Sequence, residues 1–274
     1  MELNNMNIKI MIASHKKCDV PSDPMYLPVF VGSKGKEDNG FTRDDSGDNI
    51  SEKNPLYCEL TGLYWCWKHL DCDYLGLVHY RRYFTLKNRI WQKRHDLMDC
   101  VLSSSEAAEL LNKYMIIVPK KRKYYGIETI YSHYDHTFDG KQFDAARTVL
   151  EDKYPEYVST FDEYMRSTSG YMFNMFIMPK GLADEYCTWL FDVLAELENR
   201  YDTTGMTDFE KRYIGRVAER LFDTWLMHQV KTGKISQRMI HEVPYLYMGN
   251  VNWPKKIGGF IQAKLFHKKY QQSF

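Results

Sequence analysis

Apolar and polar residues form two different patterns along this chain. Short runs rich in Ile, Val, Leu and Tyr, bounded by polar residues, predict buried strands. Elsewhere apolar residues recur at intervals of three and four, the spacing of one face of a helix. Strands that alternate with helices in this way predict an α/β fold whose mostly parallel central sheet is covered on both faces. The predicted strands are 7–13, 74–78, 114–118 and 171–178, and the predicted helices are 54–70, 103–113, 182–197 and 211–230, which makes the C-terminal part helical.

Two of the predicted helices begin with a recognisable capping sequence. Asn54 stands before Pro55, a pair that suits the cap and the first position of a helix, so we expect the Asn54 side chain to cap. Ser103, with Glu106 three residues later, forms a capping box. For the helix over 211–230, the predicted inward stripe consists of Ile214, Val217, Leu221 and Trp225.

Residues 32–54 form a long segment rich in Gly, Asp, Asn and Ser. Loops of this length in a compact domain are usually functional or disordered, so we expect a binding loop. It ends at a predicted helix N-terminus, where free N–H groups and the helix dipole attract anions. Asn49, Lys53 and Asn54 are therefore predicted to shape an anion pocket, with helix capping alone as the alternative.

The residues that follow the predicted strands are largely cationic. Ligands of parallel sheets bind in the crevice beyond the carboxyl ends of the strands. Arginine offers phosphate a planar, bidentate partner, so this edge predicts a phosphorylated ligand. For Lys120–Lys123 a solvated turn is the simpler explanation. The stronger candidates for the ligand are Ser14 and His15 after the first strand and His79, Arg81 and Arg82 after the second.

Composition narrows the classes of function. With 274 residues, of which 44% are apolar and 27% charged, the chain matches either one large globular domain or a domain with a substantial appendage. Thirty-seven Lys and Arg against 36 Asp and Glu leave a formal charge of +1, which argues against nucleic acid as a partner. The six cysteines form no C-x-x-C pair and no apolar stretch has the length of a membrane span, so we expect a cytoplasmic protein.

Several motifs of common enzymes do not occur in the sequence. The chain has no Walker loop, no G-x-G-x-x-G fingerprint and no G-x-S-x-G elbow. The sequence therefore disfavours an ATPase, a nicotinamide enzyme or a serine hydrolase. Asp71 and Asp73 form a pair of the kind that can hold a divalent metal, but they precede a predicted strand and so lie at its wrong end. His133 and His136 have the spacing of metal ligands without a third cluster, and we expect no metal there.

The string His-Tyr-Arg-Arg-Tyr-Phe over 79–84 is the most specific motif of the chain. Together with supporting segments across roughly 7–230, it resembles a bacterial family of capsular and exopolysaccharide glycosyltransferases. The resemblance implies a single GT-A-like, Rossmann-like domain and a nucleotide-sugar donor, with a UDP-sugar carrying galactofuranose or galactose as first choice. It also implies a growing polysaccharide or a lipid-linked glycan as the acceptor. The supporting segments are 48–54, 57–65, 73–77, 171–178, 186–191 and 215–221.

Inverting sugar transfer needs a base that removes the proton of the attacking hydroxyl, and a carboxylate is the usual choice. Glu219 is the first candidate, with Glu59 and Asp208 as weaker ones and a surface pair of Glu219 with Arg216 as the alternative. Arg81 and Arg82 are predicted to neutralise the diphosphate, so no cofactor is certain and Mg²⁺ or Mn²⁺ is not favoured. The predicted donor-binding residues are Ser14, His15, Asn49, Lys53, Asn54, His79, Arg81 and Arg82, and the predicted contacts to acceptor or donor are Glu59, Tyr64, His136, Asn174 and Arg220.

The end of the glycosyltransferase domain is predicted at residue 242, which leaves 243–274 as a basic amphipathic extension. No acidic residue follows Glu242, while lysines accumulate and Ile257, Ile261 and Leu265 recur at helical spacing. Such a segment binds an anionic leaflet, here the inner face of the plasma membrane, or docks on its own domain. Two other classes stay open: a nucleotidyl- or phosphosugar-processing enzyme, and a non-catalytic scaffold that binds nucleotides or polysaccharides.

Overall fold

A central sheet organises the molecule in the computed structural model, which describes residues 6–124 and 128–249. Its strands in this part of the chain are β1 Ile8–Ser14, β2 Tyr26–Phe30, β3 Thr42–Arg43, β4 Tyr74–His79, β5 Arg82–Phe84, β6 Ile116–Pro119, β9 Phe176–Pro179, β10 Ile240–Val243 and β11 Tyr245–Tyr247. They are arranged in the order β10-β6-β9-β4-β1-β2-β3, with β5 joined to β4 and β11 to β5. Two short strands, β7 Arg122–Lys123 and β8 Ser169–Gly170, pair separately.

The central sheet is mixed but mostly parallel, as predicted. β1 is parallel to β2 and to β4, β2 is parallel to β3, and β6 is parallel to β10. β9 runs antiparallel between β4 and β6. Because its direction is reversed, β9 begins at the edge of the sheet where β1 and β4 end. Residues that precede β9 therefore lie beside residues that follow the parallel strands.

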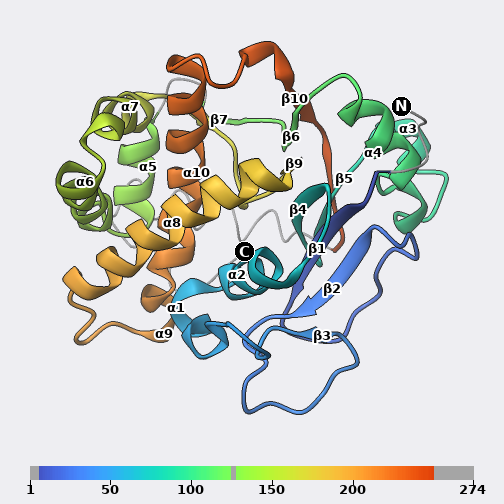
Figure 1. Cartoon of the computed structure of the whole chain (residues 1–274), viewed down its shortest axis with the longest axis horizontal. Helices are drawn as coiled ribbons and strands as arrows, with labels where there is room; N and C mark the ends of the chain where they lie inside the picture. The colour runs from blue at the N-terminus through green and yellow to red at the C-terminus, as the bar shows by residue number, and fades with distance from the viewer. Residues whose placement is uncertain (1–5, 125–127, 250–274) are drawn as a thin grey trace.

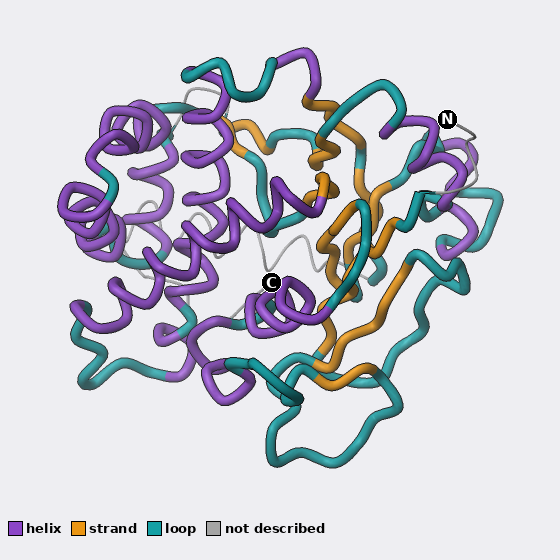
Figure 2. The backbone as a smooth tube through the Cα atoms, viewed as in Figure 1, coloured by secondary structure: helices purple, strands orange, loops and turns teal. Residues whose placement is uncertain are grey.

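Helices gather mainly to one side of the sheet, where Figures 1 and 2 show α5 to α8 and α10. The two faces of β1 alternate as a strand requires: Met11 and Ala13 pack into one apolar cluster and Ile10 and Ile12 into another. The sheet is thus buried on both faces, which explains its continuous apolar runs. The helices are α1 Asn54–Tyr57, α2 Leu60–His69, α3 Arg89–Gln92, α4 Ser104–Leu111, α5 Ile130–Thr137, α6 Lys141–Lys153, α7 Pro155–Arg166, α8 Lys180–Arg200, α9 Asp208–Lys211 and α10 Tyr213–Lys231.

The predicted helix over 54–70 is divided, and its predicted cap is wrong. α1 ends before Cys58, whose φ of 53° and ψ of −128° no helix accommodates, and α2 begins two residues later. Asn54 is inside α1 rather than at its cap, and its Nδ2 donates to the Cys58 carbonyl at 2.7 Å. The Asn54 side chain therefore stabilises the chain reversal at the end of α1. By contrast, the Ser103–Glu106 capping box of α4 is confirmed.

Two further predicted elements are shorter than their patterns suggest. β9 begins at Phe176 because Phe173 and Asn174 have φ values of 75° and 53°, which exclude a strand. The helix predicted over 211–230 begins at Tyr213, as α10, because residues 208–211 form a separate turn, α9. The predicted inward stripe of α10 is confirmed, since Ile214, Val217, Leu221 and Trp225 are all buried.

The sheet continues beyond residue 242. Val243 completes β10, and β11 pairs with β5 so that Leu246 lies opposite Tyr83. The first residues of the predicted extension therefore belong to the sheet, and its predicted amphipathic helix lies outside the described residues. Within the described ranges, no helix has both the length and the apolar character of a bilayer span.

Candidate active site at the carboxyl edge of the sheet

The ends of β1 and β4 meet the start of β9 at one edge of the sheet. Ala13 lies opposite His79 in the parallel pair of β1 and β4. The ring of His79 donates from Nε2 to the carbonyl of Phe173 at 2.5 Å, which joins the end of β4 to the segment before β9. The predicted exits of the first two strands, β1 and β4, therefore converge.

A cationic cluster forms around the ring of Tyr80, and we call it the Tyr80 cluster: His15, Lys16, Tyr80 and Arg81. The His15 ring meets the Tyr80 ring edge-on at 5.3 Å between centroids. Lys16 Nζ lies 5.7 Å and Arg81 Cζ 5.0 Å from the centre of the same ring. Partial burial lowers the pKa of His15, and the charges of Lys16, Arg81, Arg212 and Lys36 lower it further. Cations from four separate segments thus raise the positive potential at His15. A polyanionic ligand would require such a potential.

Arg82 points away from this cluster. Its guanidinium carbon lies 4.1 Å from the ring centre of Phe173 and 5.4 Å from that of Tyr247. Arg81 and Arg82, which were predicted to bind the diphosphate together, therefore have different surroundings. Arg81 is exposed beside His15, whereas Arg82 is half-buried near the ring of Phe173, which precedes β9, and that of Tyr247 in β11.

Two carboxylates, Glu59 and Glu219, face the same region from the helices. Asn174 Nδ2 donates to Glu59 Oε1 at 2.8 Å, and Glu219 Oε2 lies 3.2 Å from Nη1 of Arg220. Arg212, whose Nε donates to Cys58 Sγ at 3.3 Å, lies within electrostatic range of both carboxylates and also of His15. Arg212, which the sequence analysis missed, therefore connects the Tyr80 cluster to the candidate bases.

The backbone is strained at this point of the fold. Among the described residues, the non-glycine positions with positive φ are Cys58, Phe173 and Asn174. Cys58 precedes Glu59 in the chain and Asn174 donates to it, and Asn174 Nδ2 is also 3.4 Å from the carbonyl of Gly215. A Cβ on Gly215 would lie 3.1 Å from that of Cys58, so a larger residue there would push α10 and the end of α1 slightly apart. Strain of this kind gathers where a fold positions functional groups.

The long loop after β2 is organised by a carboxylate that the sequence analysis did not single out, Asp44. This side chain is 0% exposed. Its Oδ1 accepts from Ser33 N, Ser33 Oγ and Ser51 Oγ at 3.0, 2.9 and 2.5 Å. Its Oδ2 accepts from Gly32 N and Thr61 Oγ1 at 2.7 and 2.6 Å. The loop is therefore ordered, and Asp44 ties it to α2.

Four of the predicted donor-binding residues have polar partners within the protein. Ser14 Oγ donates to the Lys16 carbonyl at 2.5 Å within the turn after β1. Asn49 Nδ2 donates to Gly47 O at 2.9 Å, and Lys53 Nζ lies 2.7 Å from Glu198 Oε2. Asn54 contributes to the chain reversal described above. Their predicted contacts to a donor therefore stay predictions, whereas His15 and Arg81 come together in the Tyr80 cluster.

Three predicted contact residues have partners elsewhere. The hydroxyl of Tyr64 donates to Asp48 Oδ1 at 2.9 Å on the outer side of α2. His136 Nδ1 is 3.0 Å from Oε1 of Glu128, whose other oxygen is 2.7 Å from Nδ1 of His133. Arg220 is 8% exposed, with Nη1 3.0 Å from the sulfur of Met172. The structure therefore places Arg220 in the core behind Glu219.

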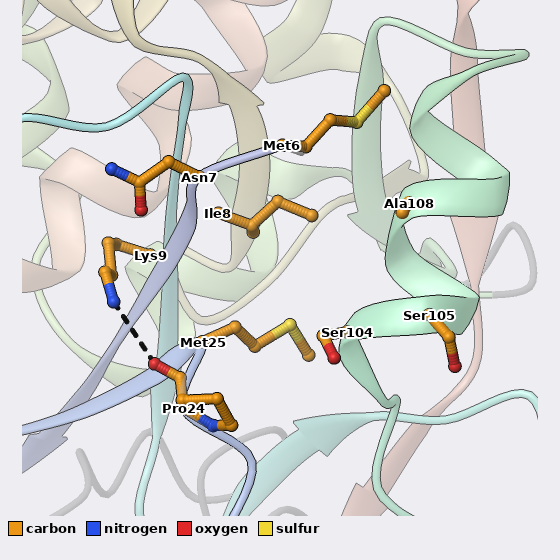
Figure 3. A pocket seen from close by; sticks show the side chains of 9 residues that line it. All are labelled: Met6, Asn7, Ile8, Lys9, Pro24, Met25, Ser104, Ser105 and Ala108. Atoms are coloured by element: carbon orange, nitrogen blue, oxygen red, sulfur yellow. Dashed lines mark hydrogen bonds between the residues drawn. The ribbon is translucent and has the colours of Figure 1, made fainter. Parts of the chain in front are cut away.

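A pocket also lies at the opposite edge of the sheet. Figure 3 shows it between the start of β1, the residues before β2 and the first turns of α4, with Lys9 Nζ 3.3 Å from the carbonyl of Pro24. Asp71 and Asp73 are at this amino edge, where Asp73 Oδ2 accepts from Asn7 N at 2.8 Å. The predicted placement of the Asp-x-Asp pair away from the candidate site is therefore confirmed. No three His, Cys, Asp or Glu side chains in the described ranges are grouped as metal ligands.

Comparisons with known proteins identify the family and a similar solved structure. A family model described as a domain of unknown function, DUF4422, matches residues 9–230. The chain belongs to the DUF4422 family. A search of curated proteins finds no match. Among solved structures, this DUF4422 domain is similar to the apo form of the WbbM bifunctional glycosyltransferase, with a TM-score of 0.78 and 29% sequence identity.

The similarity covers 89% of this chain but 46% of WbbM, so the DUF4422 domain spans less than half the length of that protein. In structure the domain is therefore glycosyltransferase-like, and the α/β fold with a mixed, mostly parallel sheet is the one that the sequence predicted. The resemblance over roughly 7–230 that the motifs indicated is confirmed to the extent of the family and of a glycosyltransferase fold.

Proposed function

We propose that this protein is a nucleotide-sugar-dependent glycosyltransferase that extends a capsular polysaccharide, an exopolysaccharide or a lipid-linked glycan. One observation carries the proposal: a cationic cluster and two carboxylates meet at the carboxyl edge of the sheet, connected by Arg212. A nucleoside diphosphate is a polyanion that needs the cations. An acceptor hydroxyl needs a base. The glycosyltransferase-like fold supports the same conclusion. Galactofuranose or galactose, carried by UDP, is the first donor to test.

In the proposed reaction, the acceptor oxygen attacks the anomeric carbon of the donor while the bond from that carbon to the diphosphate breaks. Glu219 takes the hydroxyl proton, and the configuration is inverted. His15, Arg81 and Arg212 stabilise the negative charge that develops on the departing nucleoside diphosphate. Asn174 holds Glu59 in place through the 2.8 Å hydrogen bond, so Glu59 is assigned to binding a hydroxyl of acceptor or donor.

Replacement of Arg81 by alanine is expected to weaken binding of the donor by about tenfold or more, because a hydrogen bond to a charged group contributes about 1.5–3 kcal/mol. Isothermal titration with a panel of UDP-sugars measures the change. Arg166→Ala, which removes an exposed arginine at the end of α7, is the matched control and should bind as the natural protein does. The assignment would be wrong if EDTA abolished binding while Arg81→Ala left it intact.

Binding of a nucleoside diphosphate is expected to take up a proton at His15. The lowered pKa keeps the ring neutral near pH 7 in the free protein. A bound diphosphate favours the imidazolium, so the pKa rises in the complex, and affinity falls as the pH increases between the two pKa values. Titration of UDP in buffers that differ in ionisation enthalpy measures the proton uptake. It should disappear in His15→Gln and persist in His69→Gln; equal uptake in both variants would contradict the assignment.

A further inference from the structure

The segment from Leu86 to Leu97, which follows β5, exposes large apolar side chains. The exposed fractions of Leu86, Ile90, Trp91 and Leu97 are 43%, 65%, 46% and 36%. Elsewhere in the described ranges, Tyr245 is the large hydrophobic residue that reaches this exposure. Single exposed apolar residues are common on protein surfaces, but four in one short segment form a patch.

The segment is a closed loop with a defined conformation. Its ends are joined where Thr85 Oγ1 donates to the Cys100 carbonyl at 2.6 Å. Asn88 Oδ1 accepts from the backbone N–H groups of Ile90 and Trp91 at 3.0 and 2.9 Å and so begins the short helix α3. The ring of His95 stacks on that of Trp91 at 4.0 Å. These bonds present Ile90 and Trp91 outward from a fixed backbone, in the manner of an Ω-loop.

The apolar side chains are accompanied by an excess of positive charge. Arg89, Lys93 and Arg94 are exposed, and within the described part of the chain no carboxylate lies at ion-pair distance from them. Lys87 pairs with Glu106 of α4 at 2.7 Å, which fixes the loop beside that helix (Figure 1). The segment therefore combines a protruding Ile-Trp pair with three cations that have no carboxylate partner among residues 6–124 and 128–249.

We propose that residues 86–97 form a docking surface for an anionic phospholipid bilayer. Ile90 and Trp91 enter the interface, where the amphipathic ring of tryptophan is stable at the depth of the headgroups. Arg89, Lys93 and Arg94 bind the lipid phosphates and are attracted by the negative surface potential. A protein partner would have to place carboxylates opposite all three cations around an apolar centre. An anionic leaflet offers negatively charged headgroups and an apolar interior at every point of its surface. The surface is separate from the predicted C-terminal contact and does not depend on the proposed reaction.

Flotation of the full chain with phosphatidylcholine vesicles, with and without phosphatidylglycerol, tests the proposal. The natural protein should bind only the anionic vesicles. Both Ile90→Ser/Trp91→Ser and Arg89→Glu/Lys93→Glu/Arg94→Glu should lower the partition coefficient by about tenfold or more. The matched control is Lys141→Glu/Arg166→Glu/Arg238→Glu, which makes the same change of net charge at exposed cations and should bind as the natural protein does.

Quenching by brominated lipids places the loop in the membrane directly. Bromine on the upper acyl chain should quench part of the tryptophan fluorescence of the bound protein, and Trp91→Phe should remove that quenching while binding persists. Circular dichroism verifies that every variant is folded. Failure of the natural protein to bind anionic vesicles would overturn the proposal and leave a protein partner for the patch. Binding by the loop variants equal to that of the natural protein would overturn it as well and assign the contact to residues 250–274.

Discussion

Replacing Asp44 by alanine should lower the free energy of unfolding by about 3–5 kcal/mol, the cost of breaking a buried charged network by removal of one partner. The variant removes the shared acceptor of five donor groups in a region from which water is excluded, although the Thr61 hydroxyl can still donate to the Cys58 carbonyl. Each unsatisfied buried donor costs about 1–3 kcal/mol, and partial relaxation of the loop recovers some of the sum. Urea denaturation followed by circular dichroism measures the change.

The neighbouring residue provides a matched control. Asp45 pairs with Arg43 at 2.7 Å, but both side chains are partly exposed, so Asp45→Ala should cost about 1 kcal/mol or less. Asp44→Asn keeps the shape of the side chain with a single acceptor oxygen and should fall between the two alanine variants. It also allows a measurement if Asp44→Ala does not fold. Equal stability of the two alanine variants would show that the Asp44 network does not stabilise the loop.

Glu219→Gln should lower turnover by about two orders of magnitude or more while the affinity for the donor stays the same, as expected when a general base is lost. The substitution preserves the size of the side chain and its hydrogen bond to Arg220, which the buried guanidinium can donate to an amide oxygen. The fold should therefore be unchanged. Initial rates of sugar transfer, together with titration of the donor, separate the chemical step from binding.

Two other carboxylates make this prediction specific. Asp208 begins α9 at an exposed position, so Asp208→Asn should retain normal turnover. Glu59→Gln still accepts the hydrogen bond from Asn174 and should raise the KM for acceptor or donor more than it lowers kcat. The roles of Glu59 and Glu219 would be exchanged if turnover fell by two orders of magnitude in Glu59→Gln and stayed near normal in Glu219→Gln.

The parts of the fold that periodicity determines were predicted from the sequence. Continuous apolar runs identified β1, β4 and β6, and the stripe of α10 was correct at each of its positions. β2 was not predicted, because Pro28 interrupts its short run and proline usually disfavours a strand. The direction of β9 could not be inferred either. An apolar strand buried on both faces has the same pattern whichever way it runs.

The candidate site was predicted only where it follows directly from a strand end. His15 follows β1, and His79 and Arg81 lie at and just after the end of β4, so the general rule for ligands of α/β sheets locates them. The positive φ values of Cys58 and Phe173 have no local signal such as glycine, and the asparagine at 174 tolerates positive φ without requiring it. In the sequence, Asp44 resembles an ordinary turn residue of a Gly- and Asp-rich loop. Arg212 resembles an exposed cation before a helix, so neither residue was identified.

The pairing of β6 with β10 has a consequence for how the chain acquires its structure. Ile116 lies opposite Ile240, so all the helices from α5 to α10 are synthesised between the two partners. Closing so long a loop is entropically unfavourable, and folds dominated by such distant pairings form slowly. Until residues 240–243 leave the ribosome, the outer edge of β6 has unpaired backbone groups that can recruit a strand from another chain. During translation, aggregation should therefore compete with folding most strongly in the interval between completion of α10 and arrival of β10.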